Sequence, residues 1–321
     1  MASVDDSAVI TRRRPMVTPV DVAVIGLGSM GLGMAGSLIR AGLSVAGCDL
    51  SEAARARLGE FGGRSAATPA EAATGAGALL VVVVNAAQTE AVLFGDHGAA
   101  AVLRPGAVVI ASATMAPADA RRLAARVEAL GLHYLDAPIS GGAGRAASGE
   151  LTVMASGSPA AFAAAESVLG AIAARVHALG DTPGIGSSFK IVNQLLAGVH
   201  IAAACEAMAF AKSLDLDLAR VFEVITQSAG NSWMFENRVP HILSGDYSPK
   251  SAVSIFTKDL GIVSDIGRSG SFPLPVASAA LQLFLATAAA GMAHDDDASV
   301  ARLYAMIAGL DLPSMPQAEI T

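Results

Sequence analysis

The fold of this chain is decided by the stretch Val20-Asp21-Val22-Ala23-Val24-Ile25-Gly26-Leu27-Gly28-Ser29-Met30-Gly31. Its first half predicts a β-strand. Its second half is a G-x-G-x-x-G turn at the start of an apolar helix. This motif alone is a weak signal, but between a strand and a helix it is a strong indication of a dinucleotide site. Gly26 permits the tight turn, Gly28 lets the backbone approach a pyrophosphate, and Gly31 lets the helix pack closely on the strand. We therefore predict a dinucleotide site, with the pyrophosphate on the positive end of the helix, that includes Gly26, Leu27, Gly28, Met30 and Gly31. The alternative is a tight turn without a ligand.

Asp49 ends the second predicted strand, about 20 residues beyond the glycines, where a carboxylate can accept hydrogen bonds from both hydroxyls of an adenosine ribose. A 2′-phosphate beside it would bring like charges together at a cost of about 4 kcal/mol per charge pair. No arginine follows immediately, because the next residues are Leu50, Ser51 and Glu52. The pattern favours NAD over NADP. The alternative is that Asp49 caps a helix from about Ser51.

Short β-rich runs alternate with helix-length segments over the first half of the chain. Leu79–Val84 is an unbroken apolar run, which is typical of a strand covered on both faces. Thr68-Pro69 and Ser158-Pro159 each supply a helix cap followed by proline at the first helical position. The predicted strands are 20–25, 44–48, 79–84, 107–111, 132–136, 151–155 and 176–179. This alternation predicts an α/β fold with a doubly wound parallel sheet and right-handed crossovers.

The second half predicts helices only, at 187–214, 218–228, 235–243, 251–268, 276–292 and 298–309. We place the join near Gly180–Gly184, and expect a tail at 1–17, a dinucleotide-binding domain at 18–181, an all-helical domain at 182–312 and a second tail at 313–321. The stretch 276–293 has no charge over about the length of a membrane span. It is mostly alanine, so we interpret it as a buried helix of the helical domain.

Composition excludes several classes of protein. With 53% apolar and 15% charged residues, the chain can bury a large core and is not disordered as a whole. A net charge of −7 argues against a nucleic-acid partner. Cys48 and Cys205 are too few for a disulfide framework or a four-cysteine zinc site, and the histidines lack metal-ligand spacing, so we expect no metal. Arg12, Arg13 and Arg14 precede no apolar segment, so no export signal is complete and we expect a cytoplasmic protein without a membrane partner.

Two further motifs carry candidate chemistry. Asp136-Ala137-Pro138-Ile139-Ser140-Gly141-Gly142 follows a predicted strand, at the edge of the sheet where such folds bind ligands. Its serine hydroxyl and glycine amides suit a carboxylate, although a flexible loop is the alternative. Lys190 and Asn193 lie three residues apart and so share one face of the first long helix. A lysine in the first helical turn opposes the macrodipole, and burial beside a cationic nicotinamide would lower its pKa toward a useful range. On spacing alone, a solvated surface lysine is the competing interpretation.

In order and spacing, several motifs resemble the β-hydroxyacid (3-hydroxyisobutyrate) dehydrogenase family over residues 18–310. They are Gly26–Gly31, Thr114 in Ala113-Thr114-Met115-Ala116-Pro117, Asp136–Gly142, Gly186–Asn193 and Lys258-Asp259. The resemblance implies a Rossmann domain, a helical domain built on one long interdomain helix, and an active site between the two. It further implies that Lys190 is the catalytic acid/base, that Ser140, Gly141, Gly142 and Asn193 hold a small hydroxy acid, and that Thr114 and Lys258 line the cofactor side.

Three more segments resemble the branch of this family that oxidises four-carbon sugar acids such as L-threonate at carbon two. They are Asn85–Glu90, Ser228–His241 and Gly245–Pro249, and we place Asn85 with the cofactor-binding residues. The chain departs from the family pattern at Gln194, where many members have a second Asn, and at Ala111 and Ala113, where Asp and Ser are common. Gln194 is expected to reshape the substrate pocket.

The sequence does not distinguish between several activities. The alternatives are another activity of the same family, on 3-hydroxyisobutyrate, tartronate semialdehyde or succinic semialdehyde, and a non-catalytic dinucleotide-binding module. The presence of Lys190 and Asn193 counts against the module, and the lysine also counts against the imine-reducing relatives. Candidates for an outer pocket wall are Asn231, Trp233, Phe235 and Arg238. For Trp233 the alternative is packing in the helical core or a subunit interface. Arg238 can either bind a carboxylate in a bidentate manner or pair structurally with Glu236 or Asp246. Asp295-Asp296-Asp297 suggests a solvated turn and helix cap, and the apolar helical faces suggest a homodimer or homotetramer.

Overall fold

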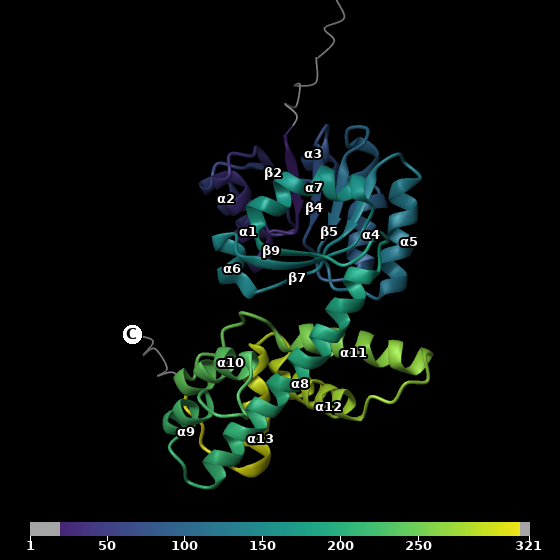
Figure 1. Ribbon diagram of the computed structural model, residues 1–321. Helices are drawn as coiled ribbons and strands as arrows, with labels where there is room; N and C mark the ends of the chain where they lie inside the picture. Colours follow the sequence, from purple (N-terminus) through teal and green to yellow (C-terminus); the bar gives the residue numbers. More distant parts are fainter. Residues whose placement is uncertain (1–19, 315–321) are drawn as a thin grey trace, which may run out of the picture.

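The computed structural model describes residues 20–314; the predicted tail 1–17 and most of the tail 313–321 lie outside this range. Six parallel strands form the main sheet in the order β3-β2-β1-β4-β5-β6 (Figure 1). Their bounds are β1 Val22–Ile25, β2 Val45–Cys48, β3 Arg64–Ala66, β4 Ala78–Val81, β5 Val108–Ala111 and β6 His133–Asp136. The order reverses beside β1, so the predicted doubly wound fold is confirmed. The short strand β3 was not predicted from the sequence.

Successive residues of the central strands point to opposite faces of this sheet, and both faces are buried. Ala23 and Ile25 of β1 join one apolar cluster, whereas Val22 and Val24 join another. The other strands and the helices on both sides of the sheet complete each cluster (Figure 1). These helices are α1 Ser29–Arg40, α2 Glu52–Glu60, α3 Pro69–Ala73, α4 Ala86–Phe94, α5 Pro117–Glu128, α6 Gly142–Ser148 and α7 Pro159–Ile172, with the 3-10 turn η1 Ala100–Val102. Thr68 and Ser158 cap α3 and α7 through their side chains, as their sequences predict.

The last predicted strands do not continue the parallel sheet, which is a correction. They form a separate three-stranded sheet from β7 Ile139–Ser140, β8 Leu151–Ala155 and β9 Ala173–Ala178. β7 pairs antiparallel with β8, and β8 pairs parallel with β9. Asp136, the last residue of β6, also exchanges backbone hydrogen bonds with Ser156, which follows β8. This antiparallel bridge connects the end of β6 to the second sheet. The segment of Ser140, considered as a flexible loop, is therefore partly an ordered strand.

The second half is helical, as predicted, and begins with the 29-residue helix α8 Ile185–Ser213, which runs from the sheet into the helical half (Figure 1). The others are α9 Leu218–Ile225, α10 Trp233–Ser244, α11 Val253–Ser269, α12 Pro275–Thr287, a π-helical turn η2 Ala288–Met292, a 3-10 turn η3 Asp297–Ser299 and α13 Val300–Ala308. Helices α10 to α13 pack on α8 around an apolar core that includes Cys205. Cys48 and Cys205 are free and buried.

The uncharged stretch near the C-terminus is less buried than its sequence suggests. Only 28% of the residues of Pro275–Met292 are buried, and Val276 and Leu285 are 62% and 44% exposed. One face of α12 packs on α8 and α11, and the other is open. By length and composition alone both α8 and Pro275–Met292 could cross a membrane, but 56% of the α8 window is buried inside the protein.

Candidate active site

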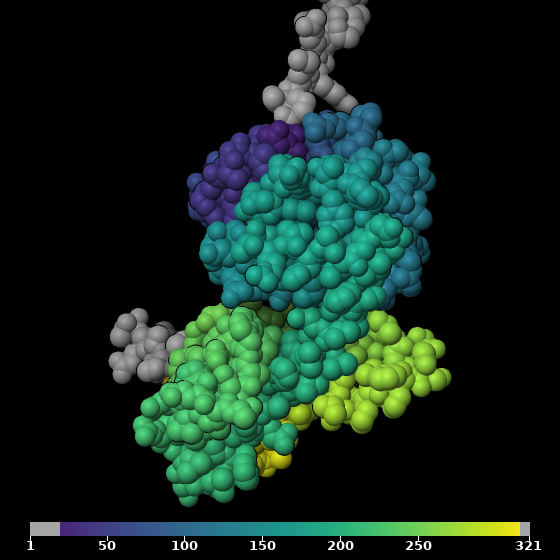
Figure 2. Space-filling model, viewed as in Figure 1, coloured from purple at the N-terminus to yellow at the C-terminus, as the bar shows by residue number. Residues whose placement is uncertain are grey.

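A cavity of about 990 Å³ lies where the carboxyl ends of the parallel strands face the helical half. The surface is visibly hollowed between the two halves (Figure 2). Three of the four lysines in the chain line this cavity, Lys190, Lys250 and Lys258, although the net charge of the chain is −7. Such a concentration of positive charge in one concave site suits an anionic ligand. The predicted residues on its wall are Gly28, Met30, Gly31, Thr114, Ser140, Gly141, Gly142, Lys190, Asn193 and Lys258.

The glycine turn leaves room for a dinucleotide. A Cβ atom on Gly31 would lie 1.8 Å from the carbonyl oxygen of Gly26, and one on Gly26 would lie 2.4 Å from that of Val82. Helix and strand are thus as close as the sequence predicts. In front of Gly28, by contrast, no atom lies within 4 Å of a Cβ position, and Gly28 caps α1 without a side-chain hydrogen bond. Open space and free amides at the start of a helix fit a pyrophosphate.

Asp49 lies beside the glycine turn, outside the cavity lining. Its Oδ2 accepts a hydrogen bond of 2.6 Å from Leu27 N, and its Oδ1 accepts one of 2.8 Å from Ser51 N. The cap of α2 is Ser51, whose hydroxyl accepts from Ala54 N, so the helix-cap alternative for Asp49 is wrong. The carboxylate therefore holds the turn of Leu27 while remaining at the end of β2, the position that suits a ribose.

Lys190 is buried, with 8% of its surface exposed, so the surface-lysine interpretation is wrong. Its Nζ donates a hydrogen bond of 2.8 Å to the carbonyl oxygen of Ile139. Desolvation by burial lowers the pKa of Lys190 to about 8, against a smaller opposing effect of Asp259 and a supporting one of Lys258. Because α8 begins at Ile185, Lys190 lies in the second turn, and burial, not the helix dipole, dominates its pKa.

Asp136 fixes the start of α8 against the sheet. Its Oδ2 accepts hydrogen bonds from Gly184 N at 2.9 Å and Ser187 N at 2.8 Å, and its Oδ1 accepts one from Ser187 Oγ at 2.7 Å. Burial raises the pKa of Asp136, and these hydrogen bonds oppose the rise. The carboxylate thus sets the position from which Lys190 reaches the cavity.

Asn193 belongs to a chain of polar contacts along the cavity wall. Its Nδ2 donates to Gln194 Oε1 at 3.0 Å, and Gln194 Nε2 donates to Asp259 Oδ2 at 2.5 Å. Lys258 Nζ lies 2.7 Å from Asp259 Oδ1, as an ion pair. Gln194, the departure from the family pattern, therefore holds the amide of Asn193, whose Oδ1 has no hydrogen bond among the described residues.

Lys258 also joins the two halves of the site, because its Nζ donates to Val84 O at 2.7 Å and to Thr114 O at 3.3 Å. Asn85 is placed differently. Its Oδ1 accepts from Gln88 N at 2.8 Å and caps α4, and it does not line the cavity. Within residues 20–314, no group of three or more His, Cys, Asp or Glu residues could hold a metal ion.

The sequence did not reveal several residues of the cavity. Ser112, directly after β5, is 6% exposed, and its Oγ has no hydrogen-bond partner among the described residues. It offers a ligand a buried hydroxyl, and its place at a strand end could have identified it. Asn237 and Lys250 also line the wall, from α10 and the loop that follows it. No periodicity signals these two, because folding of the helical half brings them there.

The outer-wall candidates separate into two groups. Trp233 and Arg238 line the cavity, whereas Phe235 is buried against Phe222 and Asn231 donates to Thr226 O and Glu236 Oε1. The partner of Arg238 is neither Glu236 nor Asp246. Its Nε and Nη2 donate to the two carboxylate oxygens of Asp297, at 2.5 and 3.0 Å.

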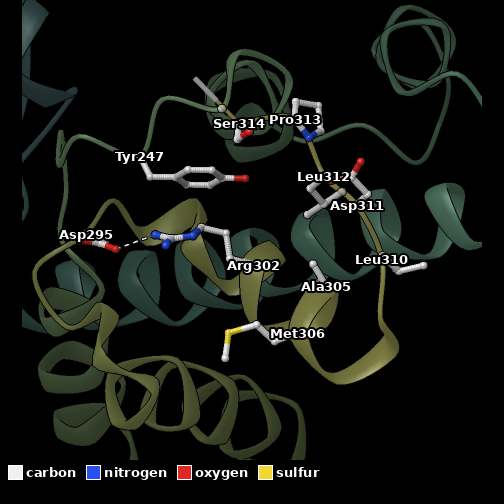
Figure 3. A pocket seen from close by; sticks show the side chains of 11 residues that line it. Tyr247, Asp295, Arg302, Ala305, Met306, Leu310, Asp311, Leu312, Pro313 and Ser314 are labelled. Carbon is white, nitrogen blue, oxygen red and sulfur yellow. Dashed lines mark hydrogen bonds and ion pairs between the residues drawn. The ribbon is translucent and has the colours of Figure 1, made fainter. Parts of the chain in front are cut away.

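The three consecutive aspartates are mostly buried, so the solvated turn is wrong. Asp296 and Asp297 are fully buried. Asp296 does cap η3 through Ala298 N, as expected, and Asp295 forms an ion pair with Arg302. A second cavity of about 640 Å³ lies beside that pair, against the segment 310–314, and contains none of the predicted site residues (Figure 3).

Comparison with known proteins covers both halves. Residues 21–180 match the family model of the NAD-binding domain of 6-phosphogluconate dehydrogenase, and residues 184–304 match that of the NAD-binding domain of NADP-dependent 3-hydroxyisobutyrate dehydrogenase. The chain is 54% identical over 293 residues to L-threonate dehydrogenase of Cupriavidus necator, covering 91% of this chain and 98% of the relative. It is 51% identical over 296 residues to L-threonate dehydrogenase of Escherichia coli K12, covering 91% and 96%. A crystal structure of 3-hydroxyisobutyrate dehydrogenase from Salmonella typhimurium superposes with a TM-score of 0.84 at 52% identity, covering 88% of this chain and 99% of that one.

Proposed function

The chain belongs to the 3-hydroxyisobutyrate dehydrogenase family, and within that family we propose that it oxidises a four-carbon sugar acid, L-threonate, to its 2-oxo acid. It is an NAD-dependent hydroxyacid dehydrogenase. One observation carries the proposal for its chemistry. The buried amine of Lys190, with its pKa lowered to about 8, opens on the cavity that also holds the glycine turn and Ser140.

Each wall of the cavity has a proposed role. Ser140 Oγ and the amides of Gly141 and Gly142 bind the substrate carboxylate, and the second N–H of Asn193 Nδ2 donates to the oxygen of the hydroxyl at carbon two, which leaves the hydroxyl proton for Lys190. The glycine turn, Ser112, Thr114 and Lys258 would hold NAD, which when bound would supply the hydride acceptor for that carbon.

Lys190 handles the proton of the reaction. As a neutral amine it keeps one N–H on Ile139 O, and its lone pair removes the hydroxyl proton as the carbonyl forms. The resulting ammonium stabilises the charge that develops on oxygen.

The four-carbon substrate has specific support. Two relatives at 54% and 51% identity carry the name L-threonate dehydrogenase. The segments that resemble this branch include Ser228–His241 and Gly245–Pro249, which supply Trp233, Asn237, Arg238 and Pro249 to the cavity wall. The rival substrate is 3-hydroxyisobutyrate, because the Salmonella structure at 52% identity bears that name.

The test is NADH formation on L-threonate, D-erythronate, D-threonate, D-glycerate and 3-hydroxyisobutyrate, with Lys190→Ala as the control. We expect kcat/KM for L-threonate to exceed the others by about a hundredfold, a difference of about 3 kcal/mol. Lys190→Ala is expected to lower kcat by about three orders of magnitude and leave the Kd for NAD within about threefold. A preference for 3-hydroxyisobutyrate would refute L-threonate as the substrate, and undiminished turnover in Lys190→Ala would refute the role of Lys190. A wild type that oxidises none of these acids would favour a non-catalytic dinucleotide-binding module.

We also propose a cytoplasmic homo-oligomer. Phe189, Val192 and Leu196 leave an apolar stripe of α8 about half exposed, and the open face of α12 adds Val276 and Leu285. A second copy of the chain would cover such surfaces. Size-exclusion chromatography coupled to light scattering measures the mass of the particle in solution. A monomer at micromolar concentration would contradict the proposed oligomer.

A further inference from the structure

Lys250 is the one lysine of the cavity to which the proposed mechanism gives no role. It lies on the loop 245–252, between α10 and α11, and so belongs to the helical half. Ser140, Gly141 and Gly142 belong to the sheet half and line the same cavity. A substrate whose carboxylate is bound at Ser140 would extend its other end toward the helical wall.

His241 and Asp296 hold the side chain of Lys250 in place. Lys250 Nζ lies 3.0 Å from His241 Nε2, and His241 Nδ1 lies 2.8 Å from Asp296 Oδ1. An ammonium only donates hydrogen bonds, so the contact with Lys250 has His241 Nε2 as the acceptor and leaves Nδ1 to donate to the carboxylate. Burial raises the pKa of Asp296, but the hydrogen bonds from His241, Ala298 and Lys250 outweigh it and lower that pKa below its ordinary value.

The loop itself is fixed by the three consecutive aspartates. Lys250 N donates to Asp296 Oδ2 at 3.1 Å, and the backbone amides of Asp296 and Asp297 donate to Tyr247 O and Ser251 O. On its other side, the Tyr247 ring lies 5.1 Å from the Arg302 guanidinium, which pairs with Asp295 (Figure 3). Lys250 is therefore presented by an anchored backbone, although its side chain is exposed.

The charge of Lys250 is available to a ligand. Lys258 contacts the carboxylate of Asp259, and Arg238 contacts that of Asp297. Among the described residues, Lys250 Nζ contacts the imidazole of His241. The carboxylate of Asp296 lies on the other side of that imidazole, hydrogen-bonded to its Nδ1. An ammonium has three N–H donors, so two remain when one is given to His241.

We propose that Lys250 is a specificity-determining residue that binds the hydroxyl at carbon four of the substrate, and that His241 and Asp296 position it for this purpose. The inference rests on the proposed function and adds the feature that separates four-carbon acids from shorter ones. A hydrogen bond from a charged donor to this hydroxyl would strengthen binding without taking part in hydride or proton transfer.

The test crosses two enzymes with two substrates. Wild type and Lys250→Met are assayed on L-threonate and on 4-deoxy-L-threonate, which lacks only the proposed contact. Hydrogen bonds to charged groups contribute about 1.5–3 kcal/mol, so Lys250→Met should lower kcat/KM for L-threonate by about 10- to 100-fold, mainly through KM. For the 4-deoxy acid we expect a change below about threefold, so that the preference of the wild type for the hydroxylated acid disappears.

Matched variants separate positioning from folding. Lys212→Met removes the one lysine that does not line the cavity and should change neither substrate. His241→Leu should reproduce the selective loss on L-threonate, and His241→Gln, whose amide oxygen can accept from Lys250, should restore most of it. Equal losses on both substrates, or no loss in Lys250→Met, would overturn the inference. If the wild type oxidises neither acid while it oxidises 3-hydroxyisobutyrate, the proposed function itself fails and this inference fails with it.

Discussion

Lys190 Nζ donates a 2.8 Å hydrogen bond to the carbonyl oxygen of Ile139, the residue immediately before Ser140. Helix α8 and strand β7 come from different halves of the sequence, and this contact joins the proposed proton acceptor to the proposed carboxylate site. It also has a chemical consequence, because a neutral amine can satisfy the carbonyl and still direct its lone pair at a substrate.

The first concerns pH. If the neutral amine of Lys190 removes the proton, kcat/KM should rise about tenfold per pH unit below a pKa of about 8 and level off above it. Asp259 raises that pKa, so Asp259→Asn should move the midpoint to lower pH. Initial rates from about pH 6 to pH 9.5 measure both. A profile that is flat over this range would exclude Lys190 as the base.

The second prediction is that the buried Lys190 lowers the free energy of unfolding at neutral pH. Burial lowers its pKa from 10.5 to about 8, which corresponds to about 3 kcal/mol against the charged form. The unfolded chain therefore binds more protons between these pKa values, so this cost is complete below pH 8 and disappears as the pH rises toward 10.5.

Lys190→Met should accordingly raise the stability at pH 7 by about 1–2 kcal/mol, once the lost hydrogen bond to Ile139 is subtracted. Its advantage over the wild type should shrink at about pH 10, where the lysine is neutral. Thermal unfolding at both pH values provides the measurement. A variant that is less stable at pH 7 would show that burial does not strain this site.

The third prediction concerns the cofactor. Asp49→Asn removes the charge that opposes a 2′-phosphate but keeps an oxygen to accept from Leu27 N or Ser51 N. We expect kcat/KM with NADP to rise by about 30-fold and the preference for NAD to fall accordingly, because one close like-charge pair is worth several kcal/mol. Asp21→Asn is the control, because Asp21 lies just before β1, at the end of that strand away from the glycine turn. It should leave the use of NADP unchanged. Unchanged use of NADP would remove Asp49 from the specificity argument.

The fourth prediction concerns the ion pair of Arg238 and Asp297, whose side chains are 10% and 0% exposed. Asp297→Asn leaves a buried guanidinium without its carboxylate and should lower the free energy of unfolding by about 3–5 kcal/mol. The exposed pair of Asp119 with Arg122 offers a control, and Asp119→Asn should cost at most about 1 kcal/mol. Calorimetry compares the two, and similar shifts in Tm would mean that the buried pair contributes no more than a surface one.

Much of the sheet half could be predicted because its signals are local. The order of strand, G-x-G-x-x-G turn and helix occupies Val20–Gly31, and its geometry depends on glycines that lie within a few residues of one another. The unbroken apolar run Leu79–Val84 predicts a strand covered on both faces in the same way, and β4 is buried throughout. The separate sheet of β7, β8 and β9 could not be foreseen, since a strand pattern does not say which strand will be its partner.

The candidate site divides similarly. Spacing places Lys190 and Asn193 on one helical face, and the family resemblance gives them roles, but neither reveals that Lys190 is buried against Ile139. Burial is what lowers its pKa, so the property on which the proposed chemistry depends is a tertiary one. The same holds for Asn85, which the sequence suggested for the cofactor and which in the structure caps α4.

Periodicities and motifs that act over short distances along the chain specify the class of fold, the dinucleotide turn and the family, so the amino-acid sequence was enough to predict them. The tertiary structure sets which charges meet. It buried Asp296 and Asp297, where the sequence suggested a solvated turn, and set Lys250 and His241 against the first of them. His241 lies 55 positions from Asp296, and Arg238 lies 59 positions from Asp297, its partner in the buried ion pair. Electrostatic contacts at such separations depend on how the helices pack, which no local pattern encodes.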